Sequence, residues 1–425
     1  MPNFSLRDEV FFQAAAQFRT PFHLYSEKGV RQTARRLKDA FAGLPSFQEY
    51  FAVKALPTPA VLRILKEEGC GVDCASLTEL MLADACGFSN DDIMFSANDV
   101  PPEEFALARK LGAYINLDDI THIGALRLNG GIPQEICLRY NPGGTFRIGN
   151  TIMGDPGDAK YGMTREQLSL ALRELKGDGV KRFGLHSFLS SNTTDPAYYP
   201  ALARLLFQTG LELMEESGLA LSFVNLSGGI GIPYRLDAPE ANIEAIGNGV
   251  AETYQKIFTA NGVGGVAVKT ELGRYMTGPN GWLVTHITNE KKIYKHYLGL
   301  DASACDLMRP AMYGAYHHIT VPGREHLPHD ELVDVTGSLC ENNDKFAIDR
   351  MLPKAEIGDI LVIHDTGAHG LSMGYNYNGK LRCKEVLYRE DGTFALIRRA
   401  ETPRDYFAAL DIDPVWQKLD KQYFQ

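Results

Sequence analysis

Apolar and polar positions along the chain follow two alternating periods from about residue 48 onward. Short apolar runs such as QEYFAVKA are typical of buried strands, and the next segment, PAVLRILKEEG, repeats apolar residues every three to four positions, as one face of a helix does. This alternation continues to about residue 280, with further strand candidates in CGVDCAS, DDIMFSA, AYINL, EICLRYNP, VKRFGLHSF, LSFVNLS and GVAVKTEL. Eight strands over about 230 residues, seven of them followed by a helical pattern, predict a (β/α)8 barrel, with an open doubly wound sheet as the alternative.

The pattern changes after about residue 280, where strand-like runs are separated by Gly, Pro and Asp turns and little helical periodicity remains. The expected fold class is therefore α/β, with a (β/α)8 barrel over residues 31–280 and an all-β sandwich or barrel domain over 281–425. Residues 1–30 contain the strand PFHLYS, which precedes the barrel and is expected to join the β domain. The Gly-rich connection over 146–163 is long and is a candidate functional loop.

Composition narrows the class of protein. The 425 residues are 44% hydrophobic and 23% charged, as in ordinary globular proteins with an ample core. With 43 basic and 53 acidic side chains the net charge is −10, which argues against nucleic acid or an anionic membrane as the main partner. The chain has no transmembrane-length apolar run, and its first residues lack the basic and apolar regions of a secretory signal. Seven cysteines without a CxxC pair indicate reduced thiols and no metal site, so we expect a cytoplasmic enzyme.

The residues that end each strand carry the functional signal, because the active site of such a barrel is built at the carboxyl ends of its strands. The first strand ends at Lys54, the seventh at the glycines of SGGIG and the eighth at Glu271. These features fit a phosphate-carrying cofactor held through a Schiff base, since loop N–H groups bind phosphate and a desolvated lysine amine attacks carbonyls. Singly, each feature has an ordinary alternative, namely a surface lysine, a plain turn and an ion-paired acid.

Several motifs, in this order, resemble those of the fold-type III PLP-dependent decarboxylases. They are FAVKA, GVDCASLTEL, SGGIGIPY, TELGRY, LMRPAMYGAYHHI, GSLCENND and HDTGAHGLSMGYNYN. The resemblance covers nearly the whole chain, from PFHLYS to LIRR, and includes the two-domain plan. It implies an amino-acid decarboxylase whose cofactor is pyridoxal 5′-phosphate (PLP).

The resemblance implies a role for each matching residue around the cofactor. Lys54 would form the Schiff base with PLP, and Glu271 would face the pyridine nitrogen and keep it protonated, so that the ring withdraws the electrons left by CO2 loss. Asp73 and Ser76 would line the cofactor on the opposite wall. The remaining cofactor contacts would come from Ser191, Gly228, Gly229, Gly231, Leu272, Gly273, Arg274 and His369.

The segment GSLCENND resembles one that a second subunit contributes across a dimer interface, which implies a homodimer with shared active sites. Cys340 would donate a proton to the carbon that loses CO2. Arginine forks bind carboxylates bidentately and a glutamate can pair with an ammonium group, so the matching substrate contacts suit a diamino dicarboxylic acid. Those contacts are Arg274, Arg309, Tyr313, Glu341 and His369.

The resemblance therefore implies decarboxylation of meso-2,6-diaminopimelate to L-lysine and CO2, the last step of lysine biosynthesis. The alternative is a related decarboxylase that acts on ornithine, on lysine of either hand or on arginine, and the presence of Arg309 favours a substrate with a second carboxylate. A non-enzymatic protein would be expected to lack Lys54 or Cys340, and both are present.

Four positions depart from the family pattern. Phe188 stands where the family generally has a histidine stacked on the PLP ring, and His186, two residues earlier, is expected to point away from it. His369 stands where the family has a tyrosine that touches both the phosphate and the substrate. Ser227 replaces the first glycine of a Gly-Gly-Gly run, and Leu272 replaces a proline. These departures leave Lys54, Glu271 and Cys340 in place but put the identity of the substrate in question.

Overall fold

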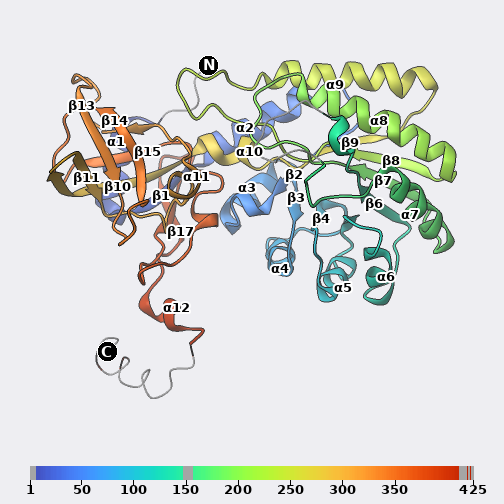
Figure 1. The fold of residues 1–425 in the computed structure, drawn as a ribbon, viewed down its shortest axis with the longest axis horizontal. Helices are drawn as coiled ribbons and strands as arrows, with labels where there is room; N and C mark the ends of the chain where they lie inside the picture. Colours follow the sequence, from blue (N-terminus) through green and yellow to red (C-terminus); the bar gives the residue numbers. More distant parts are fainter. Residues whose placement is uncertain (1–5, 147–156, 411–418, 420–421, 423–425) are drawn as a thin grey trace.

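The computed structural model describes residues 6–146 and 157–410, together with residues 419 and 422. Most of the candidate loop over 146–163 therefore lies outside the described residues. Two bodies of secondary structure share the chain, a barrel ringed by helices and a separate β domain (Figure 1). Among the described residues no helix is long and apolar enough to cross a membrane.

Eight parallel strands form the closed barrel in chain order, and β2 pairs with β9 to complete it. The strands are β2 (Phe47–Ala52), β3 (Gly71–Cys74), β4 (Ile93–Ser96), β5 (Tyr114–Leu117), β6 (Glu135–Arg139), β7 (Arg182–His186), β8 (Ala220–Asn225) and β9 (Ala267–Thr270). Closure leaves the barrel without an exposed edge, and its strands are therefore mostly buried. The predicted barrel is confirmed, and the open sheet is excluded.

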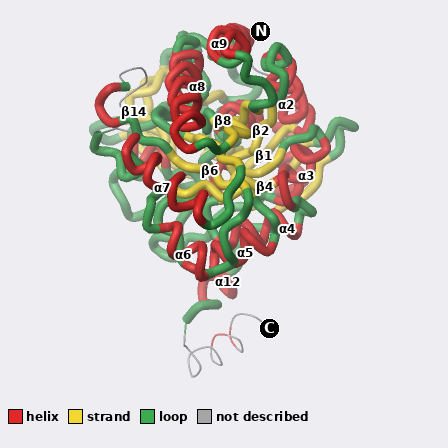
Figure 2. Tube along the Cα trace, turned by 90° about the vertical axis from the view of Figure 1, so that its right-hand side faces the viewer, coloured by secondary structure: helices red, strands yellow, loops and turns green. Residues whose placement is uncertain are grey.

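Helices surround the barrel and bury their apolar faces against it, as the tube in Figure 2 shows. They are α2 (Glu27–Ala40), α3 (Pro59–Glu67), α4 (Leu77–Ala85), α5 (Pro102–Lys110), α6 (His122–Leu128), α7 (Arg165–Gly177), α8 (Tyr198–Ser217), α9 (Ile243–Ile257) and the short α10 (Arg274–Thr277). Side-chain caps define several starts, because hydroxyl or amide oxygens accept from otherwise unpaired backbone N–H groups. Thr164 and Gln167 form a capping box at α7, and Asn242 caps α9.

The second body is built on a mixed sheet of nine described strands. Its path runs β14 (Lys345–Leu352), β13 (Glu331–Thr336), β11 (His296–Leu300), β10 (Gly281–Lys292), β1 (Phe22–Ser26), β16 (Lys384–Tyr388) and β17 (Phe394–Arg398). Strands β15 (Ile360–Ile363) and β12 (Ile319–Thr320) attach through β10. Two short helices, α11 (Arg309–Tyr313) and α12 (Pro403–Phe407), lie in its connections. The sheet is mixed because β1 runs parallel to β16 and β11 parallel to β13.

The N-terminal segment joins the β domain before the chain enters the barrel. Strand β1 pairs with β10 on one side and with β16 on the other, so it lies inside the sheet. Helix α1 (Asp8–Phe18), which the sequence pattern did not predict, packs Val10, Phe11 and Ala14 into the same core as Trp282. The segments that precede and follow the barrel in sequence thus pair with each other in the sheet of the β domain.

Candidate active site

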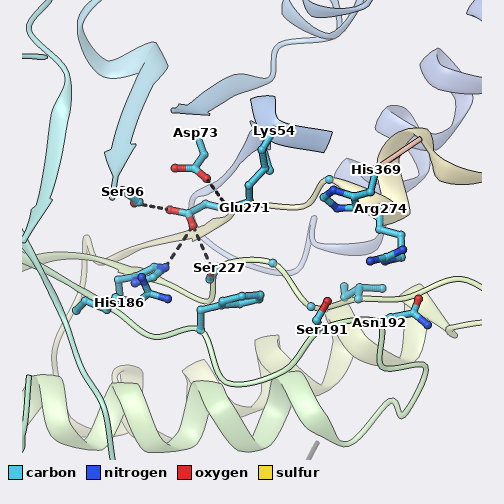
Figure 3. Close-up of a pocket in the computed structure, with 17 residues that line it drawn as sticks. Lys54, Asp73, Ser96, His186, Ser191, Asn192, Ser227, Glu271, Arg274 and His369 are labelled. Atoms are coloured by element: carbon cyan, nitrogen blue, oxygen red, sulfur yellow. Dashed lines mark hydrogen bonds and ion pairs between the residues drawn. The ribbon is translucent and has the colours of Figure 1, made fainter. Parts of the chain in front are cut away.

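One cavity opens where the barrel strands end, and it collects many of the predicted site residues. Among its lining residues are Lys54, Asp73, Ser191, Gly228, Gly229, Glu271, Gly273, Arg274 and His369. Figure 3 shows the labelled side chains among them, such as Lys54, Asp73 and Glu271, converging on the cavity from segments that are far apart in sequence. The structure therefore brings these residues together at one end of the barrel, where the strand-end rule places an active site.

Lys54 projects its amine into this cavity from a short 3-10 turn, Val53–Ala55, that follows β2. The neighbours Val53 and Ala55 are buried, which fixes the turn while the lysine side chain itself stays accessible. Its Nζ lies 3.9 Å from Oδ2 of the buried Asp73. Burial and the Glu271 charge raise the pKa of Asp73 well above its usual range, while the lysine opposes that shift. The pair places an amine beside a carboxyl group that holds its proton readily.

The Glu271 carboxylate accepts hydrogen bonds from four side chains, and Figure 3 draws those from Ser96, His186 and Ser227. Oε1 accepts from Ser96 Oγ at 3.2 Å and from Asn225 Nδ2 at 2.7 Å. Oε2 accepts from Ser227 Oγ at 3.0 Å and faces Nε2 of His186 at 3.2 Å. Burial alone would raise the pKa of Glu271, but His186, the nearby Lys54 charge and the Ser227 hydroxyl lower it. Glu271 is therefore an ionised carboxylate inside a buried site.

His186 points into the site, so the expectation that it faces away is wrong. Residues two apart on a strand share a face, so alternation could not separate them. His186, the last residue of β7, and Phe188, which follows the strand, both line the cavity. Burial lowers the pKa of His186, which keeps the ring neutral. Since Glu271 can only accept, the neutral ring carries its proton on Nε2 and donates it to the carboxylate. No partner for its Nδ1 is found among the described residues.

A Gly-rich turn brings backbone close to the cavity wall. A Cβ on Gly228 would approach the Glu271 carbonyl oxygen to 2.8 Å, and one on Gly229, whose φ is +122°, would approach the Ser190 carbonyl oxygen to 2.9 Å. Within the described chain no carbonyl accepts from the amides of Gly228, Gly229 or Gly273. Free N–H groups that line a cavity suit a phosphate group. These amides, the Lys54 amine and the Glu271 carboxylate match the phosphate, the aldehyde and the ring nitrogen of PLP.

Two arginines meet at the rim of the cavity. Arg274 and Arg309 both donate to the hydroxyl of Tyr234, the second from Nη1 at 2.8 Å. Nη1 of Arg309 also lies 3.2 Å from Nε2 of His317. No carboxylate of the described residues forms an ion pair with either arginine. Burial lowers the pKa of Arg309, and the neighbouring Arg274 charge adds to this effect. The pair is an uncompensated positive site beside the cavity.

Seven predicted site residues, Arg309 among them, do not line the cavity. Ser76 caps helix α4 by accepting from the Glu79 amide, and Leu272 is buried with its amide donating to Glu49 Oε1 at 2.8 Å. Gly231 lies against Asn192, where a Cβ would approach that residue to 2.6 Å. Three further residues, Tyr313, Cys340 and Glu341, are exposed on the β domain. Arg309 reaches the rim only through Tyr234.

Sequence reasoning assigned no role in the site to several residues that contact Glu271 or line the cavity. They are Ser96, Arg139, His186, Asn192, Asn225 and Ser227. Ser96 and Asn225 are the last residues of β4 and β8, so the strand-end rule reaches them once the strand bounds are known. Arg139 ends β6 and pairs with the buried Asp118 at 3.0 Å.

Comparison with known proteins identifies the family. The model of the pyridoxal-dependent decarboxylases, pyridoxal binding domain, matches residues 28–278. The chain belongs to this family. Protein TabA of Pseudomonas amygdali pv. tabaci is 39% identical over 93% of this chain and 92% of its own length. The diaminopimelate decarboxylase of Methanothermobacter thermautotrophicus is 34% identical over 92% of each chain.

Solved structures agree with the fold. The crystal structure of diaminopimelate decarboxylase from M. jannaschii in complex with L-lysine superposes with a TM-score of 0.87 at 29% identity, covering 95% of this chain and 94% of that one. The chain is thus a PLP-dependent amino-acid decarboxylase with a barrel and a β domain. When bound, the cofactor supplies withdrawal of the electron pair left on the substrate by the departing CO2.

Proposed function

We propose that this decarboxylase removes CO2 from meso-2,6-diaminopimelate and forms L-lysine in the cytoplasm. The observation that carries the proposal is the pair Arg274 and Arg309, which share the Tyr234 hydroxyl and have no carboxylate partner among the described residues. A partly buried guanidinium without a counter-ion is costly, and a substrate carboxylate would compensate its charge. The similarity to diaminopimelate decarboxylases at 34% and 30% identity supports the same substrate.

We infer that Lys54 binds PLP covalently and that Glu271 pairs with the ring nitrogen. The support for Lys54 is its place as the one lysine that lines the cavity among the described residues. The support for Glu271 is its ionised, fourfold hydrogen-bonded carboxylate, which keeps a proton on a facing ring nitrogen because it does not take that proton itself. The phosphate would lie on the amides of Gly228, Gly229 and Gly273, with Ser191 at the same wall.

We further propose that two copies of the chain share their active sites. Cys340, Glu341 and Tyr313 are exposed and lie outside the cavity of their own chain, although the family pattern assigns them to catalysis and substrate binding. A patch of exposed apolar side chains lies on and beside β13 and β14, and a second copy would cover it. The patch consists of Met312, Leu332, Ile348 and Met351, of which Leu332 and Met351 are paired across the two strands. In this arrangement the partner's Cys340 donates the proton that replaces CO2.

A decarboxylase of lysine, ornithine or arginine is the second candidate. His369 and Phe188 alter the cavity wall relative to the family pattern, and the name of the relative TabA does not specify a substrate. A panel assay separates the two. CO2 release is measured from meso- and LL-diaminopimelate, from both lysine enantiomers, from ornithine and from arginine, at equal concentrations. The proposal expects meso-diaminopimelate to give the highest kcat/KM, and a preference for any monocarboxylate would overturn it.

A further inference from the structure

Ser227 adopts a backbone conformation that favours glycine. Its φ is +57°, in the left-handed region, and surrounding hydrogen bonds hold it there. Its amide donates to Asn225 Oδ1 at 2.8 Å, and its carbonyl oxygen accepts from the Glu271 amide and from the Tyr199 hydroxyl, both at 2.8 Å. Since a glycine would adopt this conformation with less strain, the side chain of Ser227 needs a separate explanation.

The Ser227 side chain is buried and ends on the cofactor-facing carboxylate. Its Oγ donates to Glu271 Oε2 at 3.0 Å, while its carbonyl oxygen accepts from the Glu271 amide. Ser227 thus forms hydrogen bonds with both the backbone amide and the carboxylate of Glu271. The other donors, Ser96, Asn225 and His186, bond the carboxylate alone.

We propose that Ser227 is a positioning residue for the cofactor, whose hydroxyl holds the Glu271 carboxylate in the orientation that faces the ring nitrogen of PLP. This inference rests on the placement of Glu271 proposed above. A hydroxyl suits the task because it can rotate and share the oxygen when the ring N–H arrives, whereas an amide donor is fixed in its plane. The strained backbone is retained because it presents this hydroxyl to Oε2.

Two substitutions separate the hydroxyl from the backbone. Ser227→Ala removes the hydroxyl and keeps the strain, while Ser227→Gly removes both, so the glycine variant should melt at a higher temperature than the alanine variant. The apoproteins are titrated with PLP and with 1-deazapyridoxal 5′-phosphate, in which carbon replaces the ring nitrogen. Both variants should bind PLP about tenfold more weakly than wild type and bind the carbon analogue as wild type does, because a hydrogen bond to a charged group is lost.

Three outcomes would overturn the inference. Recovery of PLP affinity in Ser227→Gly would show that Ser227 acts only through backbone strain, and equal losses for both ligands would show that it acts only on cavity shape. The variant Glu271→Gln tests the underlying placement, since it must abolish the wild-type preference for PLP over the carbon analogue. If it does not, the proposed role of Glu271 fails; if it does while the Ser227 variants show no loss, the Ser227 inference fails alone.

Discussion

Nζ of Lys269 lies 3.3 Å from the centre of the Tyr114 ring, inside the barrel. The rings of Phe223 and Tyr50 lie 4.0 and 4.9 Å away, and the amine has no hydrogen-bond partner among the described residues. Burial lowers the pKa of Lys269 to about 7. Because a lysine in the unfolded chain keeps its proton to about pH 10.4, folding is opposed by the protonation of this residue.

We therefore expect Lys269→Met to stabilise the protein. The unfolded chain binds more protons than the folded one between about pH 7 and 10.4, so the cost is fully present below pH 7 and disappears as the pH rises through this window. The variant should gain about 4 kcal/mol in free energy of unfolding at pH 7 and little at pH 10, as measured by urea denaturation. Lys256→Met, on the exposed face of α9, is the control and should change little. An equal gain at both pH values would point to packing instead of charge.

Buried histidines make the fold sensitive to acid. Burial lowers the pKa of His317, His364 and His369 to about 3 in each case. The unfolded chain takes up these protons near pH 6.5, so stability is present above that pH and falls as the pH drops toward 3. Each histidine should contribute a slope of about 1.4 kcal/mol per pH unit in this range. Urea midpoints measured from pH 6.5 to 4.5 should fall. The three histidines together account for part of this slope, and His364→Gln should remove about a third of that part.

The sequence pattern was sufficient to predict the barrel. It was not sufficient to predict how the N-terminal segment pairs with the C-terminal strands in the β domain. Strand and helix periods locate elements such as β2 and α3, because each period reports which face of an element is buried. Helix α1 places Val10, Phe11 and Ala14 in the core at helical spacing, so its pattern was readable although it was not used. The parallel pairing of β1 with β16 joins residues more than 360 positions apart, and no local pattern encodes such a register.

Sequence reasoning selects residues that a motif marks singly, and it gives no role to residues that surround them as a network. Lys54 and Glu271 follow from strand ends and motif. The donors Ser96, His186 and Asn225 come from three different strands, and whether their side chains meet Glu271 depends on the stagger of the closed barrel. Single polar residues at strand ends are common, so only the three-dimensional register separates these from ordinary ones.

We expect Lys54→Ala to abolish turnover and the covalent attachment of PLP. No second lysine among the described residues lines the cavity and could replace it. Borohydride reduction followed by denaturation should leave PLP on the wild-type chain and none on the variant. Lys160→Ala is a matched control, because Lys160 is exposed, pairs with Asp99 and lies outside the cavity. A reducible adduct that persists in Lys54→Ala would refute the assignment.

Activity should require two copies of the chain if Cys340 acts in the partner's site. Lys54→Ala and Cys340→Ala should each be inactive alone. A mixed dimer of the two variants holds one site with both residues intact, so mixing them should restore up to about a quarter of wild-type activity if subunits exchange at random. Native mass spectrometry checks the exchange. Full exchange without any recovery would contradict the shared site.

Arg309 should set the preference for a second carboxylate. Its guanidinium donates to Tyr234 at 2.8 Å and lies 3.2 Å from Nε2 of His317, whose Nδ1 is 2.8 Å from the His364 carbonyl oxygen. Since a carbonyl only accepts, Nδ1 carries the proton of His317 and Nε2 accepts from Arg309. Two neutral acceptors thus orient the fork and leave its charge for a ligand.

Arg309→Lys keeps the charge but loses the planar fork. A charge-assisted hydrogen bond contributes about 1.5–3 kcal/mol, so kcat/KM for meso-diaminopimelate should fall by about one to two powers of ten. PLP affinity should stay at the wild-type level, because the cofactor is proposed to lie on the amides of the Gly228–Gly229 turn. Lysine turnover, measured in parallel, is the internal control. If Arg309 only stabilises the β domain, the variant will lose thermal stability and affect lysine and diaminopimelate alike, and the proposed substrate will lose its main support.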